Sequence, residues 1–271
     1  MKNHKNGNTR PLPWPLALLR LLRYALHVLE GLFTIAVAFP RISQATRLRL
    51  VLRWARGILS IFRVRLDVLG EPPGETAKVI LVANHVSWLD PALIMALRPA
   101  HFVAKSEIRA WPVLGWLAER AGTIFIERGR RHDTARISRT LSAGLSAGDS
   151  IALFPEGTTT DGAGVKPFHT SLFQAAVHSG ASLYPVALRY HHADGSLDTA
   201  PAYTGDLSFK DSLWRVARRR ELRATLAFAA PIPTEGRNRR ELAAAAETAI
   251  RAALADAAQR SAPESSAHPP A

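Results

Sequence analysis

The chain contains no cysteine. This absence excludes disulfide bonds, thiolate nucleophiles and cysteine-based metal sites, and it is compatible with a reducing compartment. Acidic residues are also scarce, with 22 Asp and Glu against 35 Lys and Arg, which gives a formal net charge of +13. This imbalance favours an anionic partner such as nucleic acid, an acidic lipid leaflet or a phosphorylated small molecule.

A long uninterrupted hydrophobic run is missing as well. The apolar stretch at residues 16–39 is broken by four polar side chains, namely Arg20, Arg23, His27 and Glu30. Its uninterrupted part, residues 31–39, is too short to cross a bilayer. No small-residue cleavage site follows a clean apolar segment, which argues against a signal peptide.

The interruptions are spaced by three and four residues, so they form one narrow polar stripe on a helix. Pro40 ends that helix, and residues 43–63 repeat the pattern with a second polar face made of Arg49, Arg53, Arg56, Ser60 and Arg63. We therefore predict that residues 1–62 are a basic segment and an amphipathic helical hairpin in a membrane interface, with arginines near lipid phosphates. The alternative is an ordinary pair of helices packed on a protein core.

From Val64 onward, short apolar runs alternate with helical patterns, which predicts an α/β domain over residues 63–260 with a largely parallel sheet flanked by helices. The expected strands are 64–69, 79–83, 102–104, 123–126, 151–154, 183–188 and 224–229. The expected helices are 91–97, 112–121, 133–147, 170–179 and 239–260. Gly148 and Gly180 stand where helices would end. The polar, proline-rich tail at 261–271 is predicted to be disordered.

The segment NHVSWLDP, residues 84–91, follows the apolar run VILVA and carries His85 and Asp90. Ligands of open α/β sheets bind where the chain leaves the carboxyl end of a strand. A histidine there can act as a general base if an acidic residue orients it. Asp90 before Pro91 is equally typical of a helix N-cap, and a lone loop histidine is often a turn residue. The pair by itself leaves both interpretations open.

A second strand end carries the segment IALFPEGTTTDGAGVKPFHTSLFQAA, residues 151–176. Glu156 follows the strand beside the backbone N–H groups of Gly157 and Thr158, an arrangement suited to a polyol or a phosphate. Lys166 and His169 add positive charge. Each residue alone could instead be a turn residue or a solvated charge.

A third strand end lies in GTIFIERG, residues 122–129. Arg128 could complete an anion pocket there, because the guanidinium group binds phosphate and carboxylate through two parallel hydrogen bonds. An exposed arginine at the end of a strand is the alternative.

These motifs together resemble the glycerolipid acyltransferase family, which includes bacterial 1-acylglycerol-3-phosphate acyltransferases. The resemblance is carried, in chain order, by H-x-x-x-x-D at residues 85–90, GTIFIER at 122–128, FPEGT at 154–158 and YPVAL at 184–188. It covers residues 64 to about 230. The ordered set is far more specific than an H-x-x-x-x-D alone.

The resemblance implies acyl transfer from acyl-CoA or acyl carrier protein to the free hydroxyl of a lysolipid, first of all 1-acyl-sn-glycerol-3-phosphate, giving phosphatidic acid. It assigns His85 as the general base and Asp90 as the residue that orients it. Arg128 and the group Glu156, Gly157 and Thr158 would bind the head group. The acyl thioester is a co-substrate, and neither a metal nor another cofactor is implied. The expected location is the cytoplasmic face of the inner membrane, peripheral or monotopic.

One departure concerns the acceptor. Family members that act on the phosphate-bearing acceptor commonly have an arginine directly after FPEGT, whereas this chain continues with Thr159, Thr160, Asp161 and Gly162. The continuation resembles members with a DG…PF pattern that act on other acceptors, such as lyso-ornithine lipid. Lys166 and Arg128 could still hold a phosphate, so both acceptors stay open.

Two other classes of function are less well supported. The basic run RVARRRELR, residues 215–223, lacks interleaved aromatic residues and any zinc or helix-turn-helix spacing. It is therefore interpreted as a solvated or lipid-facing patch, and no nucleic acid partner is expected. A non-catalytic lipid-binding protein would have no reason to retain both His85 and Asp90.

Overall fold

The central element is a mixed β-sheet. The computed structural model describes residues 10–74, 79–111, 113–126, 141, 143–145 and 149–261. Within them the sheet has seven strands in the order β1-β7-β6-β2-β5-β3-β4. The strands are β1 Val64–Leu69, β2 Val79–Ala83, β3 His101–Lys105, β4 Ile124–Ile126, β5 Ile151–Leu153, β6 Ser182–His191 and β7 Leu222–Phe228. Neighbouring strands are parallel except β6 and β7. The predicted α/β fold with a largely parallel sheet is confirmed.

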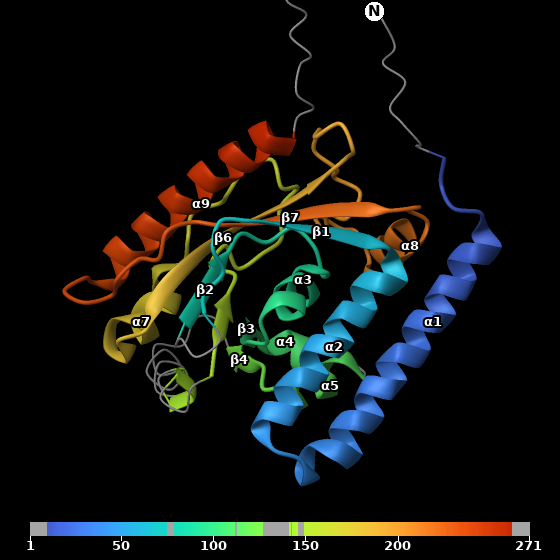
Figure 1. The fold of residues 1–271 in the computed structure, drawn as a ribbon, viewed down its shortest axis with the longest axis horizontal. Helices are drawn as coiled ribbons and strands as arrows, with labels where there is room; N and C mark the ends of the chain where they lie inside the picture. Colours follow the sequence, from blue (N-terminus) through green and yellow to red (C-terminus); the bar gives the residue numbers. More distant parts are fainter. Residues whose placement is uncertain are drawn as a thin grey trace, which may run out of the picture.

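Helices cover both faces of this sheet (Figure 1). They are α1 Trp14–Phe33, α2 Gln44–Phe62, α3 Asp90–Leu97, α4 Ser106–Arg109, α5 Leu114–Arg120, α7 Gln174–Ser179, α8 Phe209–Ala217 and α9 Arg239–Ser261. Buried side chains of α2, α3 and α8 form one core cluster with β2, β6 and β7. Those of α7 and α9 form a second cluster on the opposite face. The sheet is therefore a layer between two helical layers.

Strand β2 lies at the centre of the sheet because its sequence, VILVA, is apolar on both faces. All five of its residues are buried. Val79 and Leu81 belong to the first core cluster, and Ile80 and Val82 belong to the second. A strand covered on both faces has no solvent side and so shows no alternation of polar residues. The end of β2, directly before Asn84, is thus held rigidly.

Several boundaries differ from those predicted. Strand β6 runs three residues beyond 188, because its antiparallel ladder with β7 continues to His191, opposite Arg223. Helix α8 was not predicted. The predicted helix at 133–147 lies mostly outside the described residues, although 141 and 143–145 are helical. Gly180 ends α7 with a φ of 62°, as predicted, while Gly148 and the tail after Ser261 lie outside the described residues.

Helices α1 and α2 form the predicted hairpin. The first helix continues as a π-helical turn at Thr34–Ala38 and a 3-10 turn at Phe39–Arg41, and Ser43 caps α2 by accepting the N–H of Thr46. The two helices are locked by a reciprocal pair: His27 Nε2 lies 2.9 Å from the Trp54 carbonyl, and Trp54 Nε1 donates to the His27 carbonyl at 3.0 Å.

Two glycines permit this close crossing. A Cβ atom at Gly31 would lie 2.6 Å from the Trp54 ring, and one at Gly57 would lie 2.5 Å from the His27 ring. The two rings stack with their centroids 5.5 Å apart. A larger residue at either glycine would displace the ring that it meets, so both glycines are needed for this packing of His27 on Trp54.

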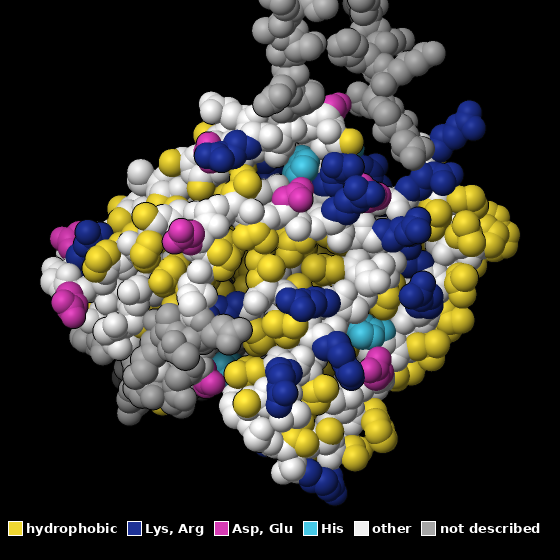
Figure 2. All heavy atoms as spheres, in the orientation of Figure 1, with side chains coloured by type: hydrophobic (Ala, Val, Ile, Leu, Met, Phe, Trp, Pro, Cys, Tyr) yellow, Lys and Arg dark blue, Asp and Glu magenta, His cyan; other side chains and the backbone are white. Residues whose placement is uncertain are grey.

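The outer side of α1 is apolar. Figure 2 shows hydrophobic side chains along this helix. They form a surface that we call the apolar ridge, made of Trp14, Leu16, Leu18, Leu19, Leu22, Leu26, Leu29 and Phe33. Trp14 is 63% exposed and Phe33 is 68% exposed. The helix Trp14–Arg41 is long and apolar enough to cross a membrane by length and composition.

In part contrary to the prediction, two residues of the polar stripe of α1, Arg20 and His27, face the protein, whereas Arg23 and Glu30 are exposed. Arg20 is buried and donates to the carbonyls of Ala217 and Arg219 at 3.0 and 2.5 Å. The expectation that this arginine lies near lipid phosphates is therefore wrong. These two carbonyls lie at the C-terminus of α8 and just beyond it, where a helix leaves backbone acceptors without helical partners. The buried guanidinium group of Arg20 supplies the missing donors.

Helix α2 behaves differently from α1. Its buried residues Ala55, Ile58, Leu59, Ile61 and Phe62 belong to the main core cluster. Its predicted polar face is exposed. The alternative interpretation of the hairpin, helices packed on a protein core, therefore describes α2 but not α1.

Candidate active site

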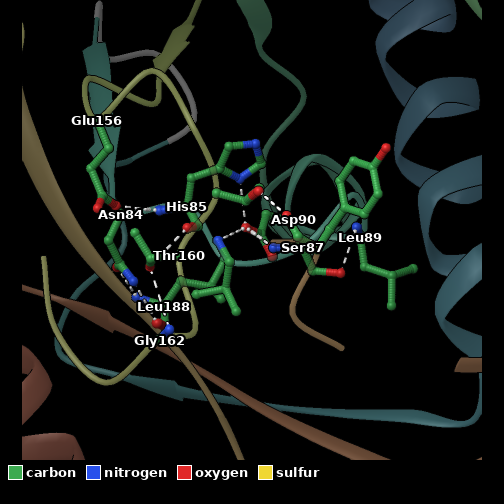
Figure 3. A network of polar contacts seen from close by, with 12 residues as sticks. Asn84, His85, Ser87, Leu89, Asp90, Glu156, Thr160, Gly162 and Leu188 are labelled. Atoms are coloured by element: carbon green, nitrogen blue, oxygen red, sulfur yellow. Dashed lines mark hydrogen bonds and ion pairs between the residues drawn. The ribbon is translucent and has the colours of Figure 1, made fainter. Parts of the chain in front are cut away.

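His85 and Asp90 form a direct hydrogen bond at the end of β2. His85 Nδ1 lies 2.7 Å from Asp90 Oδ2. A carboxylate only accepts, so Nδ1 carries the hydrogen and Nε2 is left with its lone pair. In Figure 3, Nε2 points away from the polar network. The side chain of Asp90 is fully buried while that of His85 is 21% exposed, so the free nitrogen can reach a substrate.

The carboxylate of Asp90 does not cap helix α3. The N-cap position belongs to Leu89, and no side chain caps this helix. Instead Asp90 Oδ2 turns back and accepts the N–H groups of Val86 and Ser87 at 2.7 and 2.9 Å. The N-cap prediction is wrong by one residue. The loop between His85 and Asp90 thus closes on the same oxygen that holds the imidazole.

Tyr190 completes the surroundings of Asp90. Its hydroxyl donates to Asp90 Oδ1 at 2.9 Å, and its side chain is almost fully buried. Burial, reinforced by the neighbouring carboxylate, raises the pKa of Tyr190 well above its usual range. The phenol therefore stays protonated and remains a donor. Sequence reasoning missed this residue because it lies 100 positions from Asp90 and in no recognised motif.

Phe154, from the FPEGT segment, supports the imidazole from one face. The rings of His85 and Phe154 stack with centroids 4.1 Å apart and an interplanar angle of 14°. Phe102 stacks in turn on Phe154 at 5.8 Å. Such aromatic packing leaves the imidazole few orientations.

Glu156 holds the main chain of His85. Its Oε1 accepts the N–H of His85 at 2.8 Å, and its Oε2 accepts the N–H of Lys166 at 2.8 Å. The side chain is buried, and this burial raises the pKa of the carboxyl although the two backbone hydrogen bonds oppose the shift. Both carboxylate oxygens are thus used to join two loops.

Two further contacts fix the same loop. Thr160 donates its N–H to the carbonyl of His85 at 2.8 Å. The side-chain amide of Asn84 bonds both backbone groups of Leu188, at 2.9 and 2.7 Å. His85 is therefore held through its N–H, its carbonyl and the residue before it. Neither Thr160 nor Asn84 carries a sequence signal that separates it from a turn residue.

The other residues predicted to belong to the site differ in their exposure to solvent. Gly157 has a φ of 65°, a left-handed conformation that turns the chain after Glu156. Thr158 beside it and the side chain of Lys166 are exposed. Arg128 lies outside the described residues. In the described part of the chain, no three His, Asp or Glu side chains are grouped closely enough to hold a metal ion.

This arrangement can remove a proton from a hydroxyl group. It combines an imidazole nitrogen with a free lone pair, a carboxylate that fixes the tautomer and stabilises the charged ring, and an exposed edge. A family model described as "Acyltransferase" matches residues 65–189, which include His85, Asp90, Phe154, Glu156 and Thr160, while Tyr190 lies one residue beyond it. The chain belongs to the acyltransferase family, and the protein is an O-acyltransferase of lipid metabolism.

Curated relatives divide between two acceptors. The chain is 37% identical over 212 residues to a 1-acyl-sn-glycerol-3-phosphate acyltransferase from Neisseria meningitidis, covering 78% of this chain and 83% of the relative. It is 39% identical over 208 residues to a lyso-ornithine lipid O-acyltransferase from Pseudomonas aeruginosa, covering 77% and 79%. Sequence similarity therefore gives the reaction class and leaves the acceptor to be tested.

A solved structure supports the fold. The crystal structure of the 1-acyl-sn-glycerophosphate acyltransferase from Thermotoga maritima superposes with a TM-score of 0.67 at 20% identity. The match covers 90% of this chain and 95% of that one, so it includes the N-terminal helices as well as the sheet.

Proposed function

We propose that the protein transfers an acyl group from acyl-CoA or acyl carrier protein to the free hydroxyl of 1-acyl-sn-glycerol-3-phosphate, giving phosphatidic acid. The observation that carries this proposal is the His85 and Asp90 pair, with Nδ1 bonded at 2.7 Å and Nε2 at the exposed edge. In the proposed reaction His85 Nε2 takes the proton of the acceptor hydroxyl as its oxygen attacks the thioester carbonyl carbon. The C–S bond then breaks, and the imidazolium returns the proton to the leaving thiolate.

Asp90 is a positioning residue in this reaction. It keeps the hydrogen of the imidazole on Nδ1 and stabilises the imidazolium while the proton is on Nε2. General base catalysis of this kind contributes on the order of 10²–10⁴-fold in rate. A thioester is reactive enough that no covalent enzyme intermediate is required. Glu156 and Thr160 support the step by fixing the main chain of His85.

The head group would bind beside the FPEGT turn. We assign this role to Gly157 and Thr158, which follow the buried Glu156. Lys166 supplies a cation, because its backbone bonds Glu156 while its side chain remains exposed. Arg128 is proposed as the second cation on the strength of its motif. Glu156 itself would act indirectly, since both its oxygens accept backbone N–H groups.

A second acceptor, lyso-ornithine lipid, is favoured by one observation. The residue after FPEGT is Thr159 rather than arginine, and Asp161 is exposed two positions further. An added carboxylate repels a phosphate monoester but tolerates a head group that carries an amine. The relative from Pseudomonas aeruginosa, 39% identical, is named for that acceptor.

The apolar ridge of α1 is proposed to lie in the cytoplasmic leaflet of the inner membrane. Contiguous apolar surface of this kind on a folded protein marks an interaction site. An anchor in the leaflet would bring the site to its poorly soluble acceptor, so that the lysolipid need not be extracted into water. The protein would then be peripheral or monotopic.

An acceptor panel tests the proposal. Purified full-length protein is incubated with radiolabelled acyl-CoA and, in separate reactions, lysophosphatidic acid, lyso-ornithine lipid and lysophosphatidylethanolamine. We expect the highest kcat/KM with lysophosphatidic acid. A higher value with lyso-ornithine lipid would reverse the acceptor assignment. Turnover of no acceptor with acyl-CoA or acyl carrier protein would refute the proposed function.

A further inference from the structure

A second concave site lies beside the candidate active site. It is a cavity of about 500 Å³ between the segment before α1, the end of β6, α8 and the start of β7. We call it the arginine pocket after the lining residues Arg10, Arg215, Arg218, Arg219, Arg220 and Arg223. Its volume falls within the range of about 300–1,000 Å³ that is usual for small-molecule sites. None of its lining residues lies within the segment matched by the family model.

The pocket has an excess of positive charge. Its lining includes two carboxylates. Asp198 pairs with Arg219 at 2.5 Å, and Glu221 pairs with Arg223 at 3.2 Å. The other four arginines form no ion pair within the described part of the chain. Several arginines in one concavity repel each other unless an anion neutralises them. The pocket is therefore suited to a ligand with more than one negative charge.

The pocket wall is held in place by backbone contacts. Arg218 Nε donates to the Leu12 carbonyl at 3.3 Å, and Arg220 Nε donates to the Arg10 carbonyl at 3.1 Å. These contacts use only the inner nitrogen of each guanidinium group. The two terminal nitrogens have no hydrogen bond within the described residues, and this is the edge that binds a phosphate through two parallel bonds.

The pocket borders the His85 network through β6. Leu188 is bonded by Asn84, Tyr190 is bonded to Asp90, and the next two residues, His191 and His192, line the pocket. Residues advance about 3.3 Å each along a strand, so His191 lies roughly 10 Å beyond Leu188. Because β6 and β2 are parallel, both sites lie toward the same edge of the sheet.

We propose that the arginine pocket binds the 3′-phosphorylated ADP part of an acyl-CoA donor. This inference rests on the proposed function. That group carries a phosphate monoester and a diphosphate, which match several free guanidinium edges. Trp214 adds an aromatic surface for the base, with the Arg218 guanidinium 5.9 Å from the centre of its ring. The flexible arm of CoA would then lead the thioester along the end of β6 to His85.

Two other anionic partners fit the pocket less well. A lipid leaflet presents its phosphates on a flat surface, so it would contact the exposed Arg10, Arg215 and Arg220 more readily than the half-buried arginines of the cavity. A folded acidic carrier protein is too large to enter a cavity of this volume. A nucleotide is small enough to enter it.

The test compares two donors that differ only in the nucleotide. KM and kcat are measured for acyl-CoA and for the matching acyl-pantetheine, using wild-type protein and the double variant Arg215→Gln, Arg220→Gln. The matched control is Arg237→Gln, Arg240→Gln, which removes the same charge at and just before the start of α9, where neither side chain has a hydrogen bond or ion pair within the described residues. Calorimetry also measures the direct binding of adenosine 3′,5′-bisphosphate to each protein, which tests the pocket without requiring turnover.

For the pocket variant we expect the KM for acyl-CoA to rise about tenfold to a hundredfold, the size of one or two charge-assisted contacts. The KM for acyl-pantetheine, which lacks the nucleotide, should not change. The ratio of the two KM values should therefore shift by the same factor as the KM for acyl-CoA. Binding of adenosine 3′,5′-bisphosphate should weaken in parallel, and the control should match wild type in each measurement.

Three results would overturn the inference. An equal rise in KM for both donors would indicate a structural effect. Loss of binding to phosphatidylglycerol vesicles with an unchanged KM for acyl-CoA would assign the pocket to the membrane, and an effect confined to acyl carrier protein would assign it to a protein donor. Turnover with acyl carrier protein alone would refute this inference while upholding the proposed function.

Discussion

The loop around His85 and helix α1 use polar side chains in opposite ways. In the loop, Asp90, Glu156 and Thr160 are turned inward and spend their hydrogen-bonding capacity on fixing one imidazole. In α1, Arg20 and His27 are also turned inward, but they attach the helix to the protein and leave its apolar side exposed. The first arrangement holds the candidate base rigidly. The second leaves a contiguous apolar surface of the kind that marks an interaction site.

Buried polar groups therefore have two different roles in this protein: they position His85 in one region and attach a helix to the domain in the other. A helix on a water-soluble domain normally buries its apolar face. Helix α1 departs from this pattern because its outer side exposes large apolar side chains, and this distinguishes it from a core helix such as α2. Each of the following variants alters one side of the comparison, in order of decreasing expected effect.

His85→Ala removes the proposed base. We expect kcat to fall on the order of 10²–10⁴-fold, because the acceptor hydroxyl then keeps its proton. Partition onto vesicles should not change, since α1 is untouched. The measurements are acyl transfer from acyl-CoA and vesicle co-sedimentation. Wild-type turnover by this variant would refute the base assignment.

The double variant Leu22→Glu, Leu26→Glu places two charges on the apolar ridge. Burying one leucine stabilises by roughly 1.5–3 kcal/mol, so binding to phospholipid vesicles should fall about a hundredfold or more. Co-sedimentation measures it. The control, Ala252→Glu, Ala255→Glu, adds the same charge to exposed positions of α9, across the sheet. Equal binding by both variants would show that α1 does not contact the membrane.

Glu156→Gln removes one of two carboxylate acceptors and puts an amide N–H against a backbone N–H. Hydrogen bonds to charged groups contribute about 1.5–3 kcal/mol, so we expect kcat to fall roughly tenfold to a hundredfold as His85 loses its position. The control is Glu247→Gln on α9, whose carboxylate accepts the N–H of Phe168 at 3.1 Å.

The two glutamate variants are compared by kcat and by melting temperature. Both should lose stability, because each breaks a contact between a carboxylate and a backbone N–H. Only the change at residue 156 should lower kcat. Equal kcat values would remove Glu156 from the positioning of His85.

Tyr190→Phe removes only the hydroxyl that holds Asp90. One neutral donor contributes about 1 kcal/mol, so we expect kcat to fall roughly threefold to tenfold with KM unchanged. Because burial raises the pKa of Tyr190, the phenol keeps its proton, and the same factor should hold from about pH 6 to about pH 9. Tyr184→Phe, on the same strand, is the control. A rise in KM instead would point to a role in binding.

Much of the site could be predicted because its main parts are local in sequence. A buried apolar strand followed by His85 and Asp90 predicts a strand, a loop and a helix, with the two side chains on one short loop. The same reasoning located the FPEGT turn. The partners of these residues could not be found in this way, because Tyr190 and Leu188 reach the site only through the pairing of β6 with β2.

The role of Asp90 shows where local rules fail. Asp90 followed by Pro91 satisfies the pattern of an N-cap, yet its carboxylate accepts from Val86 and Ser87 instead. Two backbone donors and an imidazole on one oxygen outweigh a single capping bond. The basic run at 215–223 is a second example, since all five of its arginines line one cavity.

The sequence by itself determined the layered α/β fold, the hairpin and the pair His85 and Asp90, because hydrophobic period and turn residues act over a few positions. Only the tertiary structure decided which way α1 faces, what holds Asp90 and Glu156, and that distant arginines share a cavity. Besides short-range bonds, those features depend on contacts between residues that lie far apart in the sequence, from 71 positions for Glu156 and His85 to 210 for Arg220 and Arg10. Such contacts are set by the order of strands in the sheet, and no local pattern records that order.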